Sequence, residues 1–291
     1  MPTPGRSDFW RQPSGDPADA AARRRARARR RGPSAEAVTE GFWAYPLLFA
    51  AAFAGGLIDA IAGGGGLITI PALLASGLPP QLALGTNKFQ ASFGSFTASL
   101  HYTRTGVVRP GELRAGILFT LIGAAAGAWT VQQIRIEVLA TLIPFLLLAA
   151  GVYSLFSPRL GDLDTHRRFR ELPFYAVTGL AFGFYDGFFG PGVGSFWAIA
   201  LVTALGHNLT RATGTTKVMN FTSNVVSLAV FLLGGAVVFP AGLLMAAGQI
   251  AGARIGAGLV IRRGAKLIRP VLVTVVLITT IKLLFDRFSS P

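Results

Sequence analysis

Long apolar segments alternate with short polar ones along most of the chain. The apolar runs cover residues 44–62, 66–77, 84–102, 115–131, 138–156, 173–189, 193–206, 218–239, 241–261 and 267–285. Several come close to the roughly 20 residues that an α-helix needs to cross about 30 Å of hydrocarbon. They are apolar all round, whereas the strands of a membrane barrel alternate over about ten residues. The pattern therefore predicts an all-α polytopic membrane protein.

The composition narrows the class of protein further. Apolar residues make up 52% of the chain and charged residues 14%, whereas an ordinary soluble domain carries about 25% charged residues. The chain has no cysteine, which excludes disulfides, thiolate metal sites and cysteine nucleophiles. Its three histidines, His101, His166 and His207, form no metal-ligand pattern. We predict no metal, no cofactor and no catalytic residue, and we keep an intramembrane enzyme only as a rival to a non-enzymatic function.

Much of the net charge of +14 comes from the first residues. Residues 1–41 contain nine arginines, seven of them in "RRRARARRR" at 23–31. We expect 1–41 to be a disordered Arg-rich tail and 42–286 to be a single transmembrane domain. A solvated tail near membrane lipid is favoured over a specific nucleic-acid partner, because basic runs carry little specificity. We reject a signal peptide at "FAAAFAGG", because the repeat described next needs residues 55–62.

An internal repeat divides the domain into residues 42–156 and 173–286, with a linker at 157–172. "ALGTNK" (83–88) matches "ATGTTK" (212–217) at an offset of 129, and "GLIDAIAGGGG" (56–66) lies over "GFYDGFFGPGV" (183–193) at an offset of 127. Each half is predicted to have a glycine-broken helix pair followed by three transmembrane helices. Irregular backbone at membrane depth has to line a cavity or be buried in protein, and matched breaks point to a transporter binding site. A packing hinge without a ligand is the alternative.

The loop charges indicate how the halves are oriented. Loops 103–114, 157–172 and 262–269 are rich in arginine and lysine, and such loops face the cytoplasm. The charged loop follows the third apolar run in the first half but the fourth in the second, so we expect inverted repeats. Inversion places both termini outside, whereas a parallel arrangement would keep the tail inside and expel loop 262–269.

Two pairs of glycines, Gly123 with Gly127 and Gly252 with Gly256, recur at the 129-residue offset. Glycines four residues apart allow the backbones of two helices to approach closely. We expect both pairs to be helix contacts.

Two lysines stand in segments that otherwise resemble membrane spans. An ionisable residue at the centre of a membrane helix costs roughly 2.5–3.5 kcal/mol on insertion scales, so it is a functional candidate. Lys88 and Lys217 occupy matched positions, and snorkelling to an interface is their alternative. Hydroxyl and amide groups nearby can bind the oxygens of a small anion, and helices that begin at the glycine breaks would add backbone donors. The predicted substrate-binding residues are Lys88, Lys217, Asn87, Thr86, Gln90, Thr215, Thr216, Asn220, Gly65 and Gly192.

Two carboxylates, Asp59 and Asp186, come just before the glycine breaks. They could pair with the lysines, take up a proton during transport, or cap the broken helices. The sequence leaves these three roles open.

The motifs "GLIDAIAGGGGLITIPALL", "GLPPQLALGTNK", "GFYDGFFGPGVGSF" and "RATGTTKVMN" resemble the sulfite exporter TauE/SafE family, also called the toluene sulfonate uptake permeases. The resemblance covers about residues 44–286 and implies a multi-pass permease of the bacterial inner membrane. It implies sulfite, an organosulfonate or a related small sulfur-containing anion as substrate. We expect a secondary transporter that alternates access around a site between the halves, coupled to a proton, to a cation or to substrate exchange. An anion channel is the closest alternative, and a homodimer stays open.

Overall fold

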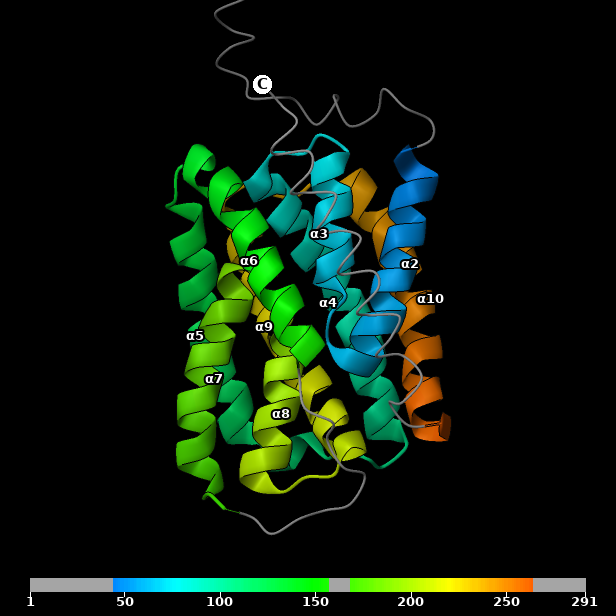
Figure 1. Cartoon of the computed structure of the whole chain (residues 1–291), viewed down its shortest axis with the longest axis vertical. Helices are drawn as coiled ribbons and strands as arrows, with labels where there is room; N and C mark the ends of the chain where they lie inside the picture. The colour runs from blue at the N-terminus through cyan, green and yellow to red at the C-terminus, as the bar shows by residue number, and fades with distance from the viewer. Residues whose placement is uncertain (1–43, 157–167, 264–291) are drawn as a thin grey trace, which may run out of the picture.

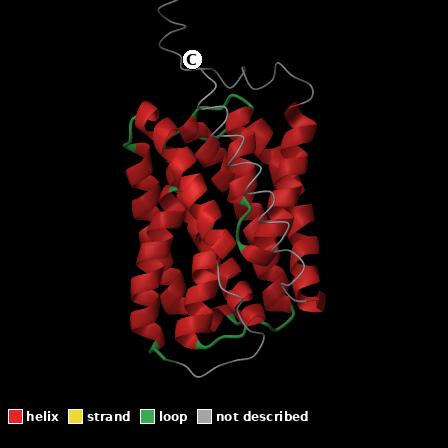
Figure 2. Cartoon of the chain, in the orientation of Figure 1, coloured by secondary structure: helices red, strands yellow, loops and turns green. Residues whose placement is uncertain are grey.

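The structure is a computed structural model that describes residues 44–156 and 168–263, and in these ranges every regular element is helical (Figure 2). The Arg-rich tail, most of the linker and the last apolar run lie outside the described residues. In chain order the elements are α2 (Ala44–Ala62), α3 (Gly66–Ala75), α4 (Pro80–Arg104), the 3-10 helix η2 (Pro110–Leu113), α5 (Arg114–Gln132), α6 (Ile136–Phe156), α7 (Glu171–Phe188), α8 (Val193–Leu205), α9 (Leu209–Leu233) and α10 (Phe239–Arg263).

Most of these helices coincide with the apolar runs, but α9 does not. The run predicted a helix from residue 218, whereas α9 already begins at Leu209 and ends at Leu233. Its first turns contain the polar stretch Thr213–Lys217, and all five of these residues are buried. Hydropathy underestimates a helix whose polar face is buried in protein rather than exposed to lipid.

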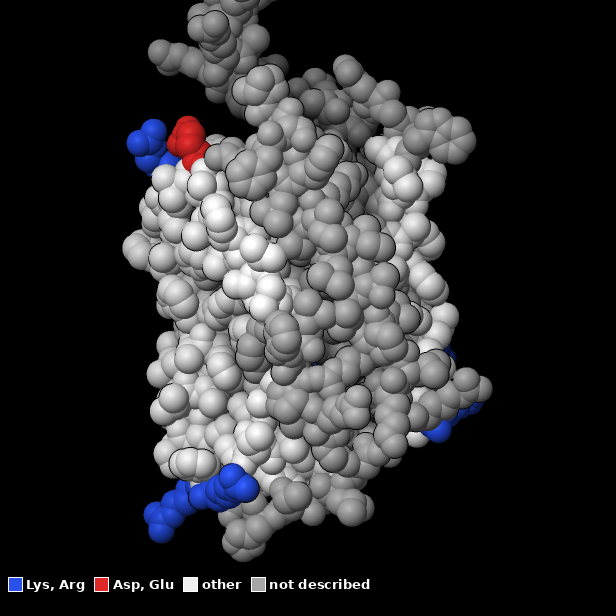
Figure 3. All heavy atoms as spheres, in the orientation of Figure 1, with Lys and Arg blue, Asp and Glu red and all other residues white. Residues whose placement is uncertain are grey.

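The outer surface of the described helices suits a lipid environment. Four segments are long and apolar enough to cross a membrane by length and composition: α2, Pro110–Gln132, α9 and α10. Large apolar side chains are exposed on several helices, among them Leu47, Trp129, Phe145 and Val177. On the face drawn in Figure 3, the visible charged side chains gather near the two ends of the molecule. The chain is thus an all-α, polytopic membrane protein, as its sequence predicts.

Two helix pairs are broken at the predicted glycines. In Figure 1, α2 descends from the upper end and α3 turns back upward, whereas α7 rises from the lower end and α8 turns back downward. Gly63 (φ 77°), Gly190 (φ 104°) and Gly192 (φ 84°) have positive φ angles. Residues that carry a Cβ atom rarely adopt this conformation, whereas glycine adopts it readily. Each pair is therefore a hairpin whose tip lies inside the molecule.

The tips of the two hairpins touch. A methyl group on Gly63 would overlap the Cα of Gly194, and the Ser195 hydroxyl donates a hydrogen bond to the Ala62 carbonyl oxygen over 3.1 Å. Glycine is required at this crossing because the two backbones leave no room for a side chain.

The predicted glycine contacts between helices are confirmed. The most extensive contacts join α5 to α7 and α2 to α10. A Cβ on Gly123 would lie 2.8 Å from the backbone nitrogen of Phe184, and one on Gly252 would lie 2.7 Å from that of Leu57. Phe184 and Leu57 are themselves 127 residues apart, the offset of the sequence repeat. The first helix of each predicted half thus packs against a helix of the other half.

Candidate functional site

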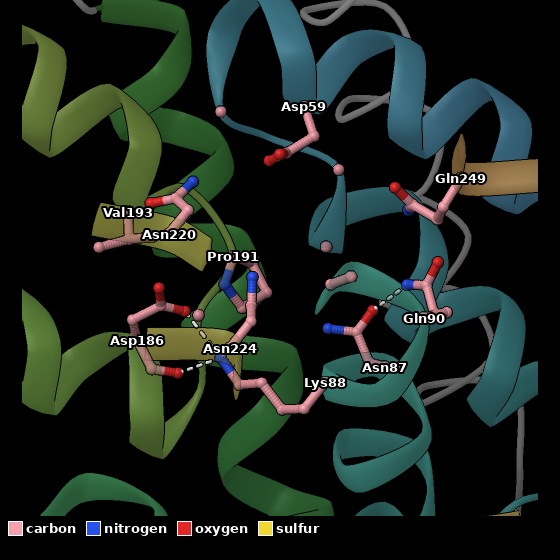
Figure 4. A pocket seen from close by; sticks show the side chains of 15 residues that line it. Asp59, Asn87, Lys88, Gln90, Asp186, Pro191, Val193, Asn220, Asn224 and Gln249 are labelled. Atoms are coloured by element: carbon pink, nitrogen blue, oxygen red, sulfur yellow. Dashed lines mark hydrogen bonds and ion pairs between the residues drawn. The ribbon is translucent and has the colours of Figure 1, made fainter. Parts of the chain in front are cut away.

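A cavity lies at the level of the two glycine breaks (Figure 4). It encloses about 400 Å³ of space free of atoms, its open part included. The lining comes from α2, α4, α7, α9, α10 and both breaks, and consists of Asp59, Gly63, Gly65, Gly66, Asn87, Lys88, Gln90, Ala91, Asp186, Gly190, Pro191, Val193, Asn220, Asn224 and Gln249. Polar groups from distant parts of the chain therefore meet around one partly open cavity.

One buried ion pair joins α4 to the end of α7. The Lys88 Nζ lies 2.7 Å from the Asp186 Oδ1, and the two side chains are 1% and 5% exposed. Lys88 also donates to the backbone carbonyl of Asp186 and to Asn224 Oδ1 over 3.3 Å. The other carboxylate oxygen of Asp186 accepts a hydrogen bond from the Ser223 hydroxyl. All three protons of the ammonium group and both carboxylate oxygens thus have partners.

The position of this pair follows from the break in α7. The last carbonyl groups of a helix have no partner within it and carry partial negative charge. Asp186 lies in the last turn of α7 (Glu171–Phe188), so its carboxylate adds a negative charge where the helix dipole disfavours one. Lys88 offsets both by binding the carboxylate and the backbone carbonyl. A methyl on Gly190 would lie 2.8 Å from the Lys88 Nζ, so the glycine break makes room for the ammonium group.

A second ion pair joins α9 to the end of α2. The Lys217 Nζ lies 3.1 Å from the Asp59 Oδ2. Lys217 is 0% exposed, but the side chain of Asp59 is 22% exposed and lines the cavity. Each lysine therefore pairs with the aspartate of the other predicted half, the first of the three roles that the sequence left open.

The amide groups of α4 form a short network beside the pairs. Gln90 Nε2 donates to Asn87 Oδ1 over 2.7 Å, and the Thr69 hydroxyl donates to the same oxygen over 2.6 Å. Figure 4 shows the amide nitrogen of Asn87 turned towards the middle of the cavity. Gln90 Oε1 and Asn220 Oδ1 are buried and have no hydrogen-bond partner among the described residues. The cavity thus offers both donors and acceptors to a bound solute.

Two helices begin at the cavity. Gly66 is the first residue of α3 and Val193 the first of α8, and both line the cavity. The first turn of a helix has backbone N–H groups without intrahelical partners and a partial positive charge, which favour anions. In this structure several of these N–H groups already donate to carbonyl oxygens of the breaks, among them Leu67 to Gly64 and Val193 to Gly190. The dipole ends therefore add partial positive charge beside two lysines and two aspartates whose formal charges cancel.

Five of the ten predicted binding residues line the cavity: Lys88, Asn87, Gln90, Asn220 and Gly65. Lys217 does not line it but contacts the lining residue Asp59. Thr86, Thr215, Thr216 and Gly192 do not line it. The Thr86 hydroxyl accepts from the backbone nitrogen of Val238, and the Thr216 hydroxyl donates to the Ala212 carbonyl within α9. A Cβ on Gly192 would face Ala150 of α6 at 3.1 Å. Thr86 and Thr216 thus make backbone hydrogen bonds, Gly192 packs against α6, and Thr215 is buried.

Sequence reasoning missed Gln249, which enters the cavity from α10. An added methyl group on Gly56 or Gly94 would overlap Gln249, and one on Gly55 would lie 3.2 Å from its Nε2. The signal was present in the sequence, because Gln249 is an uncharged polar residue inside the apolar run 241–261.

Comparison with known proteins agrees with this architecture. The family described as sulfite exporter TauE/SafE matches residues 48–283. A "Probable membrane transporter protein" of Haemophilus influenzae is 47% identical over 241 residues, 83% of this chain and 94% of the relative. "Probable membrane transporter protein YfcA" of Escherichia coli K12 is 47% identical over 84% of this chain and 91% of the relative. "Probable membrane transporter protein ORF9" of a Sinorhizobium species is 46% identical over 82% of this chain and 92% of the relative.

No solved structure gives a significant match. The relatives are bacterial and nearly half identical along most of their own length, and the family match extends over most of this chain. The chain therefore belongs to the sulfite exporter TauE/SafE family and is a multi-pass membrane transporter.

Proposed function

We propose that this chain is a secondary transporter of the bacterial inner membrane for sulfite, an organosulfonate or a related small sulfur-containing anion. The observation that carries the proposal is the cavity between the two glycine breaks, where α3 and α8 begin and where both lysine–aspartate pairs join the predicted halves. Helix N-termini at a midplane break suit an anionic group. The amide nitrogen of Asn87 adds a donor directed into the same space (Figure 4).

The two halves are proposed to be inverted repeats that rock against each other around this cavity. The hairpins α2–α3 and α7–α8 enter from opposite ends of the molecule (Figure 1). Crossed ion pairs and the matched glycine contacts of α5–α7 and α2–α10 agree with a two-fold relation between the halves. The turn from α4 to α5, the start of α7 and the end of α10 all lie at the lower end in Figure 1. These segments carry most of the described arginines, so the lower end is proposed to face the cytoplasm.

A carrier is favoured over a channel. The backbones of the two hairpin tips are in contact at Gly63 and Gly194, which leaves no space for an ion between them. A carrier opens such a barrier on one side at a time. Because the sequence has no nucleotide-binding motif, the energy would come from an ion gradient or from substrate exchange.

A cation, or a solute that donates hydrogen bonds, is the second candidate substrate. The unpartnered oxygens of Gln90 and Asn220 favour it, because an anion cannot satisfy an acceptor. The carboxylate of Asp59 would add a third acceptor on the cavity surface.

Ligand-dependent thermal unfolding of the purified protein separates the candidates. The panel contains sulfite, sulfate, thiosulfate, methanesulfonate, an aryl sulfonate, chloride and sodium. A ligand that binds the native state alone stabilises it by about 2.7 kcal/mol at one hundred times its Kd. We expect stabilisation by a sulfur anion in the wild type and in Arg254→Met, which removes an exposed charge of α10, but not in Lys217→Met. Stabilisation by sodium and by none of the anions would overturn the anion proposal.

A further inference from the structure

The two lysine–aspartate pairs occupy matched places in the sequence repeat but have different surroundings. Asp186 is held by Lys88 and by the Ser223 hydroxyl, and its side chain is 5% exposed. Asp59 contacts Lys217 at 3.1 Å, and its side chain is 22% exposed and lines the cavity. Both carboxylate oxygens of Asp186 therefore have partners although the pair borders the cavity, whereas the Asp59 carboxylate is more exposed.

The sequence explains this difference. The 129-residue offset relates Ser223, which binds Asp186, to Gly94. Gly94 has no side chain to donate, and a methyl group there would overlap the Gln249 Oε1. The same offset relates Gln90 and Gln249, beside the cavity, to Met219 and Thr120, which contact each other through the Met219 sulfur and the Thr120 hydroxyl at 3.5 Å. A serine thus binds Asp186, whereas the matched position near Asp59 is a glycine and offers no hydroxyl to its carboxylate.

The charge on Lys217 needs a counter-charge. The side chain is 0% exposed, and an isolated buried ammonium group is too costly to keep its charge. In the present state Asp59 neutralises it. If Asp59 took up a proton from the cavity, a bound anion could take its place as the counter-ion, and the net charge of the site would not change.

We infer that Asp59 is the proton-coupling residue of this transporter: it is protonated as the anion binds beside Lys217, while the Lys88–Asp186 pair stays closed as a structural clamp. This rests on the proposed anion function and adds its coupling ion. One proton binds the Asp59 carboxylate for each monovalent anion bound, so the proton and the anion together add no net charge to the site. The lysine then exchanges one partner for another and stays neutralised.

The other ionisable groups around Asp59 support this assignment. Lys88 and Asp186 share the cavity with Asp59, but each neutralises the other. The hydroxyl group of Tyr102 in α4 donates a hydrogen bond to the Ala60 carbonyl oxygen over 3.1 Å. Gln249, which faces the cavity from α10, cannot titrate. Lys217 is therefore the charged group that responds when Asp59 gains a proton.

Proton uptake during anion binding tests the inference. The probe is methanesulfonate, which keeps a constant charge across the working pH range. Isothermal titration calorimetry in two buffers of different ionisation enthalpy measures the protons taken up per anion bound. For the wild type we expect about one proton per anion, and an affinity that rises about tenfold for each unit of pH decrease while Asp59 is ionised in the free protein. Binding without proton uptake would overturn the inference and leave the anion function standing.

Matched variants identify the residue. Asp59→Asn imitates the protonated carboxyl and keeps an oxygen for Lys217, so we expect binding that no longer depends on pH and takes up no proton. Ser223→Ala removes a partner of Asp186 and leaves Asp59 unchanged, so the uptake should stay at its wild-type value. Proton uptake that persists in Asp59→Asn would overturn the assignment. Absence of binding by methanesulfonate and by every other sulfur anion of the thermal-unfolding panel, in the wild type and in Asp59→Asn alike, would instead overturn the anion function, and the inference with it.

Discussion

Because α2 and α10 approach each other closely, a single methyl group added between them should destabilise the protein. Gly252 of α10 faces the backbone of α2, where an added Cβ would overlap the carbonyl oxygen of Phe53 and lie 2.7 Å from the nitrogen of Leu57. Backbone atoms cannot rotate aside as a side chain can. Gly252→Ala must therefore push the two helices apart.

The expected loss can be worked out from these contacts. Carbon atoms pack best at about 3.5–4.0 Å, so the helices have to separate by about 1 Å. Overpacking of this kind costs about 1–3 kcal/mol, and we place Gly252→Ala near the upper end because the overlapped atoms are backbone. Alanine is a better helix former than glycine by about 1 kcal/mol. The net loss of unfolding free energy should thus be about 2 kcal/mol.

Gly258 in the same helix is the matched control. A Cβ there meets no atom within 4 Å, so Gly258→Ala should stabilise the protein by about 0.5–1 kcal/mol through helix propensity. Thermal unfolding of both purified variants, followed by tryptophan fluorescence, measures the two effects. For a chain of this size, a change of 1 kcal/mol in the unfolding free energy shifts the unfolding midpoint Tm by about 2–4 °C. The reasoning is refuted if Gly252→Ala is as stable as Gly258→Ala.

Two further predictions concern the clamp and the orientation. Asp186→Ala leaves Lys88 buried without its carboxylate partner and should lower the unfolding free energy by about 3–5 kcal/mol. The double variant Asp186→Leu with Lys88→Met should recover much of that loss in the same assay. A double variant less stable than Asp186→Ala would contradict this reasoning. Because the chain has no cysteine, Arg109→Cys and Arg135→Cys each introduce a single reactive thiol at an exposed position. A membrane-impermeant thiol reagent applied to whole spheroplasts should label the Arg135→Cys variant and leave the Arg109→Cys variant unlabelled. The reverse pattern would contradict the proposed orientation.

The sequence predicted the helices best where burial in protein and exposure to lipid both select apolar residues. The run 44–62 coincides with α2, because that helix is apolar on all faces. The first turns of α9 are polar and buried, and a hydropathy pattern cannot distinguish a buried polar face from an exposed one. The start of α9 was therefore placed too late in the chain.

The repeat identified the charged residues of the site but not their pairing. Matched positions pointed to Lys88, Lys217, Asp59 and Asp186, yet pairing across the halves depends on how the hairpins pack in three dimensions. The threonines beside the lysines shared the same sequence context, yet Thr86 and Thr216 form hydrogen bonds with the backbone and lie outside the cavity lining. Gln249 was missed because it comes from a distant run that belongs to neither matched motif.

The contact of α2 with α10 also bears on how the protein is made. Phe53 and its neighbour in the fold, Gly252, lie far apart in the chain, and at about 5–20 residues per second the ribosome needs roughly 10–40 s to go from one to the other. During that time α2 is in the membrane without the helix that packs against it most closely. Asp59 at its end gains Lys217 with α9, and its cavity is completed by Gln249 when α10 inserts. The cavity is thus completed only after both hairpins, and the Gly63–Gly194 contact between their tips, have been synthesised.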